Sequence, residues 1–175
     1  MGRTETAELN PHGVSFAGAT SVIAVVAVLI LVSLPRLSAF AVEENESDAA
    51  ALTRSLAAAL DDHAREPDAG AATLAALVDA LGMEPRTDDM EWLDGGRVLR
   101  RHGYLFELSS AGAAPVLRAW PWAYGKSGRS AFVAEPGGEV RRHANAEGGW
   151  SGLGCPPAAG CAGWDTLDGI ELASW

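Results

Sequence analysis

Hydrophobic residues are concentrated in one long stretch near the start of the chain. No charged residue occurs from Val14 to Leu34, and residues 22–32 read VIAVVAVLILV. About 20 apolar residues are enough for a helix to cross a hydrocarbon core that is roughly 30 Å thick. The pattern therefore predicts a membrane-spanning helix over residues 14–34.

A helical pattern continues beyond this apolar stretch. Leu52, Leu56 and Leu60 recur every four residues, which places them on one side of a helix. The spacing predicts a single long helix over residues 14–62, preceded by a polar leader at residues 1–13. Its second half therefore carries a one-sided apolar stripe.

The remaining residues, 63–175, change to short segments divided by turn signals. A second helix is expected over residues 69–81, with Asp68 as its cap and Gly82 as its stop. Alternating strand-like segments then follow turn sequences such as Asp94-Gly95-Gly96 and Pro136-Gly137-Gly138. The expected strands are 97–101, 103–108, 116–122, 130–135 and 139–142. We predict the α+β class, with a long membrane-spanning helix followed by a small antiparallel β domain in an extracytoplasmic compartment.

Charge narrows the range of partners. The 175-residue chain carries a formal net charge of −10. An acidic surface repels phosphate backbones, so no nucleic acid is expected as a partner.

The N-terminal residues also match a known pattern. Gly13 ends a polar leader, Val14 begins the apolar run, and Leu34-Pro35-Arg36-Leu37 follows about 20 residues later. This arrangement resembles the type IV pilin and type II secretion pseudopilin superfamily. The resemblance implies processing between Gly13 and Val14, and a helix that holds the subunit in the membrane before it assembles with other pilin-like subunits.

Two positions differ from that superfamily pattern. Gly18 stands five residues after Gly13, where the family usually carries Glu, and Val14 replaces the usual Phe. The family's glutamate is thought to pair with a neighbour's amino terminus inside the filament. Minor pseudopilins at filament tips can also lack it. The β region resembles domains on bacterial pilin-like proteins of unassigned role, through Gly103, Tyr104, Phe106, Ala119, Pro121, Gly125, Gly128, Phe132 and Gly138.

Two other interpretations of residues 1–42 stay open. The apolar stretch is also typical of an uncleaved membrane anchor. Alternatively, it is a secretory signal peptide, because Ala39-Phe40-Ala41 has the small-x-small form of a signal peptidase site.

The two cysteines indicate the cellular compartment in which the domain is expected to lie. Cys155 and Cys161 lie six residues apart around Pro156-Pro157, which suits a small disulfide loop. A disulfide would require an oxidising compartment. We therefore expect a single-pass inner-membrane protein with residues 36–175 in the periplasm.

The sequence offers few candidates for catalytic or metal-binding residues. Asp165, Asp168 and Glu171 are weak calcium candidates, and so are Glu43, Glu44, Glu46 and Asp48, which could equally form the solvated side of a helix. Gly125-Lys126-Ser127-Gly128 lacks the full spacing of a phosphate-binding loop and is expected to be a hairpin turn. We expect no catalytic residues, no metal and no cofactor.

Tryptophan is abundant, with six residues in the chain. Core packing explains some of them, and an exposed aromatic contact surface is the rival interpretation for Trp120, Trp122, Trp150, Trp164 and Trp175. The expected function is non-enzymatic, as a pilin-like subunit or minor pseudopilin of a bacterial secretion or filament system. The alternative is a stand-alone anchored or secreted binding module.

Overall fold

The computed structural model describes residues 16–66, 70–83, 89–109 and 114–167. The chain divides into two compact units, Met1–Ser38 and Ala39–Trp175. The N-terminal helix α1 (Phe16–Arg65) contributes to both. Each unit is described by itself.

The first unit contains the apolar part of α1. All large apolar side chains of residues 22–34 are exposed, as is Leu37. Pro35 lies inside the helix, where it cannot donate the backbone hydrogen bond to the preceding turn. The acceptor that loses its donor is the carbonyl of Leu31, and the hydroxyl of Ser38 makes a separate hydrogen bond to the carbonyl of Pro35 at 2.9 Å.

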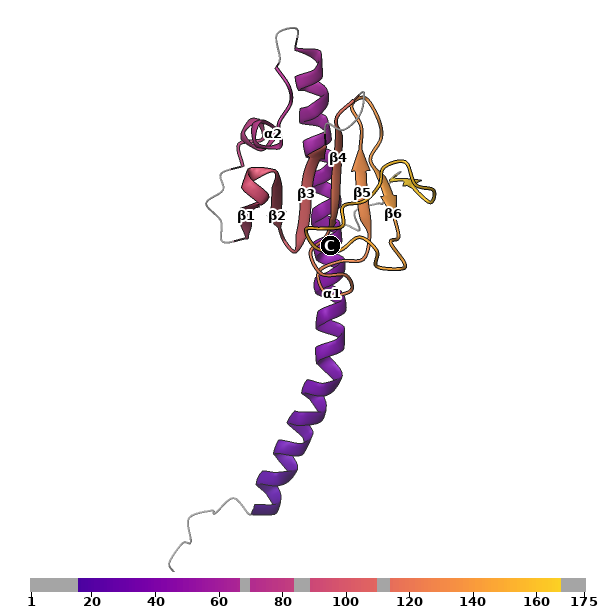
Figure 1. Ribbon diagram of the computed structural model, residues 1–175. Helices are drawn as coiled ribbons and strands as arrows, with labels where there is room; N and C mark the ends of the chain where they lie inside the picture. The colour runs from indigo at the N-terminus through magenta and orange to yellow at the C-terminus, as the bar shows by residue number, and fades with distance from the viewer. Residues whose placement is uncertain (1–15, 67–69, 84–88, 110–113, 168–175) are drawn as a thin grey trace, which may run out of the picture. The chain divides into compact units, whose positions relative to one another are not determined.

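The second unit is built on an antiparallel sheet that follows the helix. Its seven strands within the described residues are β1 (Met90–Leu93), β2 (Val98–Arg101), β3 (Tyr104–Ser109), β4 (Val116–Pro121), β5 (Ala131–Ala134), β6 (Arg141–His143) and β7 (Asp165–Thr166). Each strand pairs with the next in chain order, and Figure 1 shows β1 to β6 side by side in that order. The long helix followed by an antiparallel sheet confirms the predicted α+β class.

The second part of α1 packs on one face of this sheet. Its predicted stripe is buried, with Leu52, Leu56 and Leu60 at most 8% exposed. Alternate residues along each strand point to the same face. The sheet therefore presents every second side chain to the helix, and this side of the core holds Leu99, Tyr104, Phe106, Leu117, Ala119, Phe132 and Ala134.

The other sheet face has a smaller core. Val98, Leu105, Trp120 and Ala131 are buried there, and Leu93, Trp150 and Trp164 pack against them. The segment after β6 thus covers part of the face opposite α1.

The second helix, α2 (Leu74–Ala80), is shorter than the predicted 69–81. Thr73 caps it, because its side chain accepts a hydrogen bond from the N–H of Ala76 at 3.2 Å. The expected cap, Asp68, lies outside the described residues. Gly82 ends the helix with φ at +63°, as the sequence predicts.

The predicted turns agree with the structure. Gly137 has φ at +69°, and the N–H of Gly138 donates to the carbonyl of Glu135 between β5 and β6. A short 3₁₀ helix, η1 (Asp94–Gly96), joins β1 to β2 where the turn sequence occurs. Residues 125–128 form a turn closed by the N–H of Gly125 and the carbonyl of Gly128, which makes a phosphate-loop interpretation unnecessary.

Candidate functional site

The most prominent surface of the first unit is the apolar stretch of α1. Every large apolar side chain from Val22 to Leu34 keeps between 47% and 69% of its surface exposed. Of the helices in the described residues, α1 is the one that is long and apolar enough to cross a membrane. Length and composition make it a candidate membrane-spanning helix, and a secretory signal sequence would meet the same criteria.

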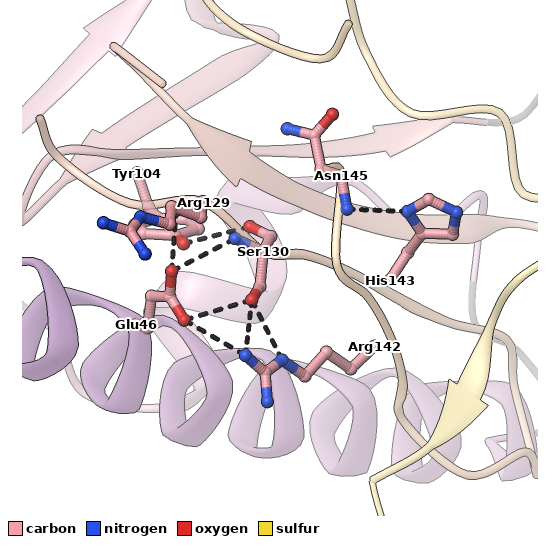
Figure 2. A network of polar contacts seen from close by, with 7 residues as sticks. All are labelled: Glu46, Tyr104, Arg129, Ser130, Arg142, His143 and Asn145. Atoms are coloured by element: carbon pink, nitrogen blue, oxygen red, sulfur yellow. Dashed lines mark hydrogen bonds and ion pairs between the residues drawn. The ribbon is translucent and has the colours of Figure 1, made fainter. Parts of the chain in front are cut away.

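In the second unit, a polar network joins α1 to the sheet around Glu46 (Figure 2). The Glu46 carboxylate accepts hydrogen bonds from the backbone N–H of Arg129 at 2.7 Å and from that of Ser130 at 3.1 Å. It also accepts from the Ser130 hydroxyl at 3.0 Å. The guanidinium of Arg142 on β6 lies 3.4 Å from the same carboxylate and 2.8 Å from the hydroxyl oxygen of Ser130.

This network satisfies a largely buried charge rather than exposing it. Only 17% of the Glu46 side chain is accessible, and Arg142 supplies the opposite charge. A carboxylate with several donors and a cation is stable in such a place. Its arrangement suits a structural fastener, because both carboxylate oxygens accept hydrogen bonds from residues of the sheet and the loop before β5.

Tyr104 extends the network into the core. Its ring is fully buried, and its hydroxyl donates to the carbonyl of Ser130 at 3.0 Å. Burial raises the pKa of Tyr104 well above its ordinary value, and the nearby Glu46 adds to the shift. Gly128 leaves room for the ring, since a Cβ there would lie 2.2 Å from the phenol oxygen.

A second polar cluster lies at the turn between β2 and β3. His102 Nδ1 is 2.8 Å from a carboxylate oxygen of Asp48 on α1, and its Nε2 contacts Asp89. His102 has φ at +45°, a conformation that is uncommon for residues other than glycine. The two carboxylates hold the imidazole by both nitrogens and tie the turn to the helix.

A cavity of about 370 Å³ opens beside this cluster. Asp48, His102 and Arg101 form its polar wall, and Leu52, Leu81 and Phe106 are among its apolar residues. The guanidinium of Arg101 donates to Met83 Sδ at 3.8 Å, and its Nε lies 3.7 Å from Asp89, an ion pair without a hydrogen bond. The cavity can accommodate a small molecule with both apolar and polar parts.

The aromatic residues separate into different environments. Trp120 is 1% exposed and belongs to the core, whereas Trp122 is 38% exposed. Trp150 and Trp164 stack with their ring centroids 5.5 Å apart, and His143 lies with its edge toward both. Core packing is confirmed for Trp120, whereas a partner-contact role for the exposed Trp122 stays a prediction; Trp175 lies outside the described residues.

The predicted disulfide is wrong for this structure. Cys155 and Cys161 are both free cysteines, the first exposed and the second half-buried. Two prolines directly after Cys155 restrict the backbone φ angle at two of the five intervening residues. The cysteine argument for an oxidising compartment therefore falls, and the periplasmic placement of residues 36–175 stays a prediction.

The structure separates the acidic residues that the sequence groups together. Glu46 and Asp48 contact the sheet and His102, whereas Glu43 and Glu44 are exposed. Within the described ranges no set of three or more His, Cys, Asp or Glu side chains is arranged to hold a metal ion. Asp165 is exposed on β7, while Asp168 and Glu171 lie outside the described residues, as do the processing residues Gly13 and Val14.

The Glu46 and His102 contacts were not predicted. Helical spacing offers a signal for both, because Glu46 lies three residues before Ala49, and Asp48 lies four before Leu52. Both carboxylates thus belong to the side of α1 that faces the sheet. Their partners, 54 to 96 residues away in the chain, leave no trace in the local pattern.

Comparisons with protein families, with curated proteins and with solved structures found no match.

Proposed function

We propose that this protein is a membrane-anchored, non-enzymatic, pilin-like subunit, a minor pseudopilin, of a bacterial secretion or filament system. One observation carries the proposal. The same helix, α1, contains the exposed apolar residues 22–34 and the residues, such as Leu56, that form the core with the sheet. A helix with both properties serves as an anchor and as the backbone of a folded domain.

The proposed mechanism is an exchange of apolar surroundings. In the membrane, side chains such as Val25 and Leu29 contact lipid. In an assembly, the same side chains pack against apolar helices of other subunits, which costs little because lipid tails and apolar side chains are similar solvents. The Glu46 network and the His102 cluster keep the sheet fastened to α1 during this exchange.

Site-specific crosslinking in cells tests the assembly. A photoreactive amino acid replaces Val25 in the apolar stretch or, as a matched control, Glu139 in the turn between β5 and β6; both positions are exposed. The proposal expects the probe at position 25 to form adducts with other single-helix, pilin-like subunits, and the probe at position 139 to form none of these. Adducts with lipid alone from position 25 would contradict assembly.

The cavity beside His102 favours a second function, an anchored module that binds a small molecule. Its 370 Å³ volume and mixed lining provide the reason. Under this function, substitution of Leu52 by Phe to fill the cavity would abolish ligand binding. The crosslinking probe at position 25 would then form adducts with lipid alone.

A further inference from the structure

Large apolar side chains are exposed at few places in the second unit. In its described residues they are Phe40, Trp122, Tyr124 and Leu153, and Phe40 is 61% exposed. All other large hydrophobic residues of this unit's described part are buried or half-buried. The four exposed ones are called the aromatic end here.

Hydrogen bonds bring the aromatic end together from distant segments. The N–H of Trp122 donates to the carbonyl of Gly103 at 2.9 Å, and the N–H of Tyr124 donates to the Ser151 hydroxyl at 3.0 Å. The N–H of Gly152 donates to the carbonyl of Pro121 at 3.2 Å, which places the next residue, Leu153, beside the end of β4.

The aromatic end lies where α1 enters the second unit. The side-chain amide of Asn45 donates to the carbonyl of Ser127 at 3.0 Å, in the loop that carries Tyr124. Phe40 precedes Asn45 by five residues on the same helix. Figure 1 shows the loop between β4 and β5 next to this part of α1.

Chain length limits how far this end can be from the apolar stretch. Only five residues, 35–39, separate Leu34 from Phe40. Even a fully extended chain covers only about 20 Å over that interval. The interval is helical, so Phe40 follows Leu34 by a rise of about 9 Å; if residues 14–34 cross a bilayer, Phe40 lies next to its headgroup region.

The side chains at the aromatic end have the chemistry of that region. Tryptophan and tyrosine prefer the membrane–water interface, because each has an apolar ring and a polar group. The guanidinium carbon of Arg100 also lies over the ring of Trp122, 5.3 Å from the ring centroid. Two exposed cations, Lys126 and Arg129, lie nearby. Three exposed glutamates, Glu43, Glu44 and Glu147, outnumber them, so electrostatic attraction to anionic lipid does not drive this contact.

We propose that the aromatic end rests in the headgroup region of the bilayer that α1 crosses, and so fixes the β domain against the membrane. This inference depends on the membrane anchorage in the proposed function. It adds a second contact, made by Trp122, Tyr124 and Leu153, which α1 alone does not require. The domain would then be held by two points and not by the helix only.

Spin-label accessibility in the full-length chain tests the contact. Cys155 and Cys161 are first replaced by serine, since both are free. Single cysteines then replace Lys126 at the aromatic end, Glu139 in the distant β5–β6 turn, and Val28 in the apolar stretch. The labelled chains are reconstituted into phosphatidylcholine vesicles, and collision rates with oxygen and with a water-soluble nickel chelate are compared.

We expect the label at position 28 to be reached by oxygen and protected from nickel. The label at position 126 should show a nickel collision rate several-fold lower than the label at position 139. Equal nickel rates at 126 and 139, with 28 protected, would overturn the aromatic-end contact and leave the anchor intact. Nickel access at 28 would overturn the anchor, and this inference with it.

A variant with Trp122→Gln and Tyr124→Gln isolates the aromatic contribution. With the label at position 126, the nickel collision rate should rise to that of position 139, while position 28 stays protected. An unchanged rate at 126 in a folded variant would show that the aromatic side chains do not hold this end at the membrane, and would overturn the proposal.

Discussion

Single polar residues add specific contacts between α1 and the sheet to the apolar core that joins them. Glu46 accepts two backbone hydrogen bonds and one hydroxyl hydrogen bond from residues 129–130, and Arg142 lies against it. The N–H groups of Arg129 and Ser130 follow the 125–128 turn and precede β5. The carboxylate acts as their acceptor and fixes the helix in one register.

Replacement of Glu46 by Gln should lower the free energy of unfolding by roughly 1–3 kcal/mol, because an amide NH₂ would face N–H donors and Arg142 would lose its counter-charge. Denaturant unfolding of the full-length chain in detergent measures this loss. The control, Glu44→Gln, changes an exposed glutamate on the same helix and should stay within about 0.5 kcal/mol. Equal effects of the two variants would contradict the role of Glu46.

Gly128→Ala tests the contact between the turn and the Tyr104 ring. The new Cβ would lie 2.2 Å from the phenol oxygen, so the ring or the turn must move, at an expected cost of about 1–3 kcal/mol. Gly149→Ala is the matched control, because a Cβ there meets nothing within 4 Å. The midpoint of thermal unfolding should fall for the first variant only, and an unshifted midpoint would mean that the turn adjusts freely.

Tyr104 should make stability depend on alkaline pH. Burial raises the pKa of Tyr104 in the folded chain, so above about pH 10 the unfolded chain releases this proton and the folded chain keeps it. Stability should then fall by up to about 1.4 kcal/mol per pH unit from this group. Urea unfolding across that range should show a shallower decline for Tyr104→Phe, whereas Tyr124→Phe should retain the full decline.

The extent to which these residues could be predicted differs from one to the next. The burial of Leu52, Leu56 and Leu60 follows from their spacing, because a helix repeats its faces every three to four residues. The contact of Asp48 with His102 does not, since its partner lies 54 residues away on a turn whose position depends on the folded sheet. The disulfide prediction failed for a related reason, because sequence separation does not determine the geometry between two cysteines.

At the level of elements, the predicted helix–strand order is confirmed, with small differences at the boundaries. The central strands β3 and β4 match their predictions within one residue, because alternating apolar residues and flanking turns define them. β1 and β7 were missed. β1 is four residues long with half-buried side chains and β7 is two residues long, so neither carries enough alternation to be recognised.

The apolar part of α1 provides a test of membrane insertion. Leu29→Arg places a charge near the middle of the stretch, where the side chain is 60% exposed. The free energy of membrane insertion should become less favourable by about 3 kcal/mol. The matched control is Leu29→Ile. After carbonate extraction, a smaller fraction of Leu29→Arg than of Leu29→Ile should remain in the membranes. Equal resistance of the two variants would argue against a spanning helix.

At the scale of the whole molecule, the apolar stretch of α1 is the surface through which copies of this chain, or this chain and other membrane proteins, would associate. Residues 22–34 are apolar on all sides, so they provide a general apolar contact without a charge that could set the register between subunits. Gly18 removes one candidate for such a charge, because the pilin pattern places a glutamate there. A buried carboxylate is tolerated between apolar helices only when a neighbour's cation pairs with it, and that requirement is what fixes the register.

We therefore expect that this chain alone does not form long homopolymers. Without a charge at position 18, helices can slide past one another at little cost, and small residues permit close approach without choosing one offset. Overexpression of the chain by itself, followed by shearing and electron microscopy, should show no filaments. The matched variant Gly18→Glu restores the carboxylate of the pilin pattern and, if register is the missing element, should be the one that polymerises. Abundant filaments of the unaltered chain would require another device to set register, and they would contradict the proposed role as a minor subunit.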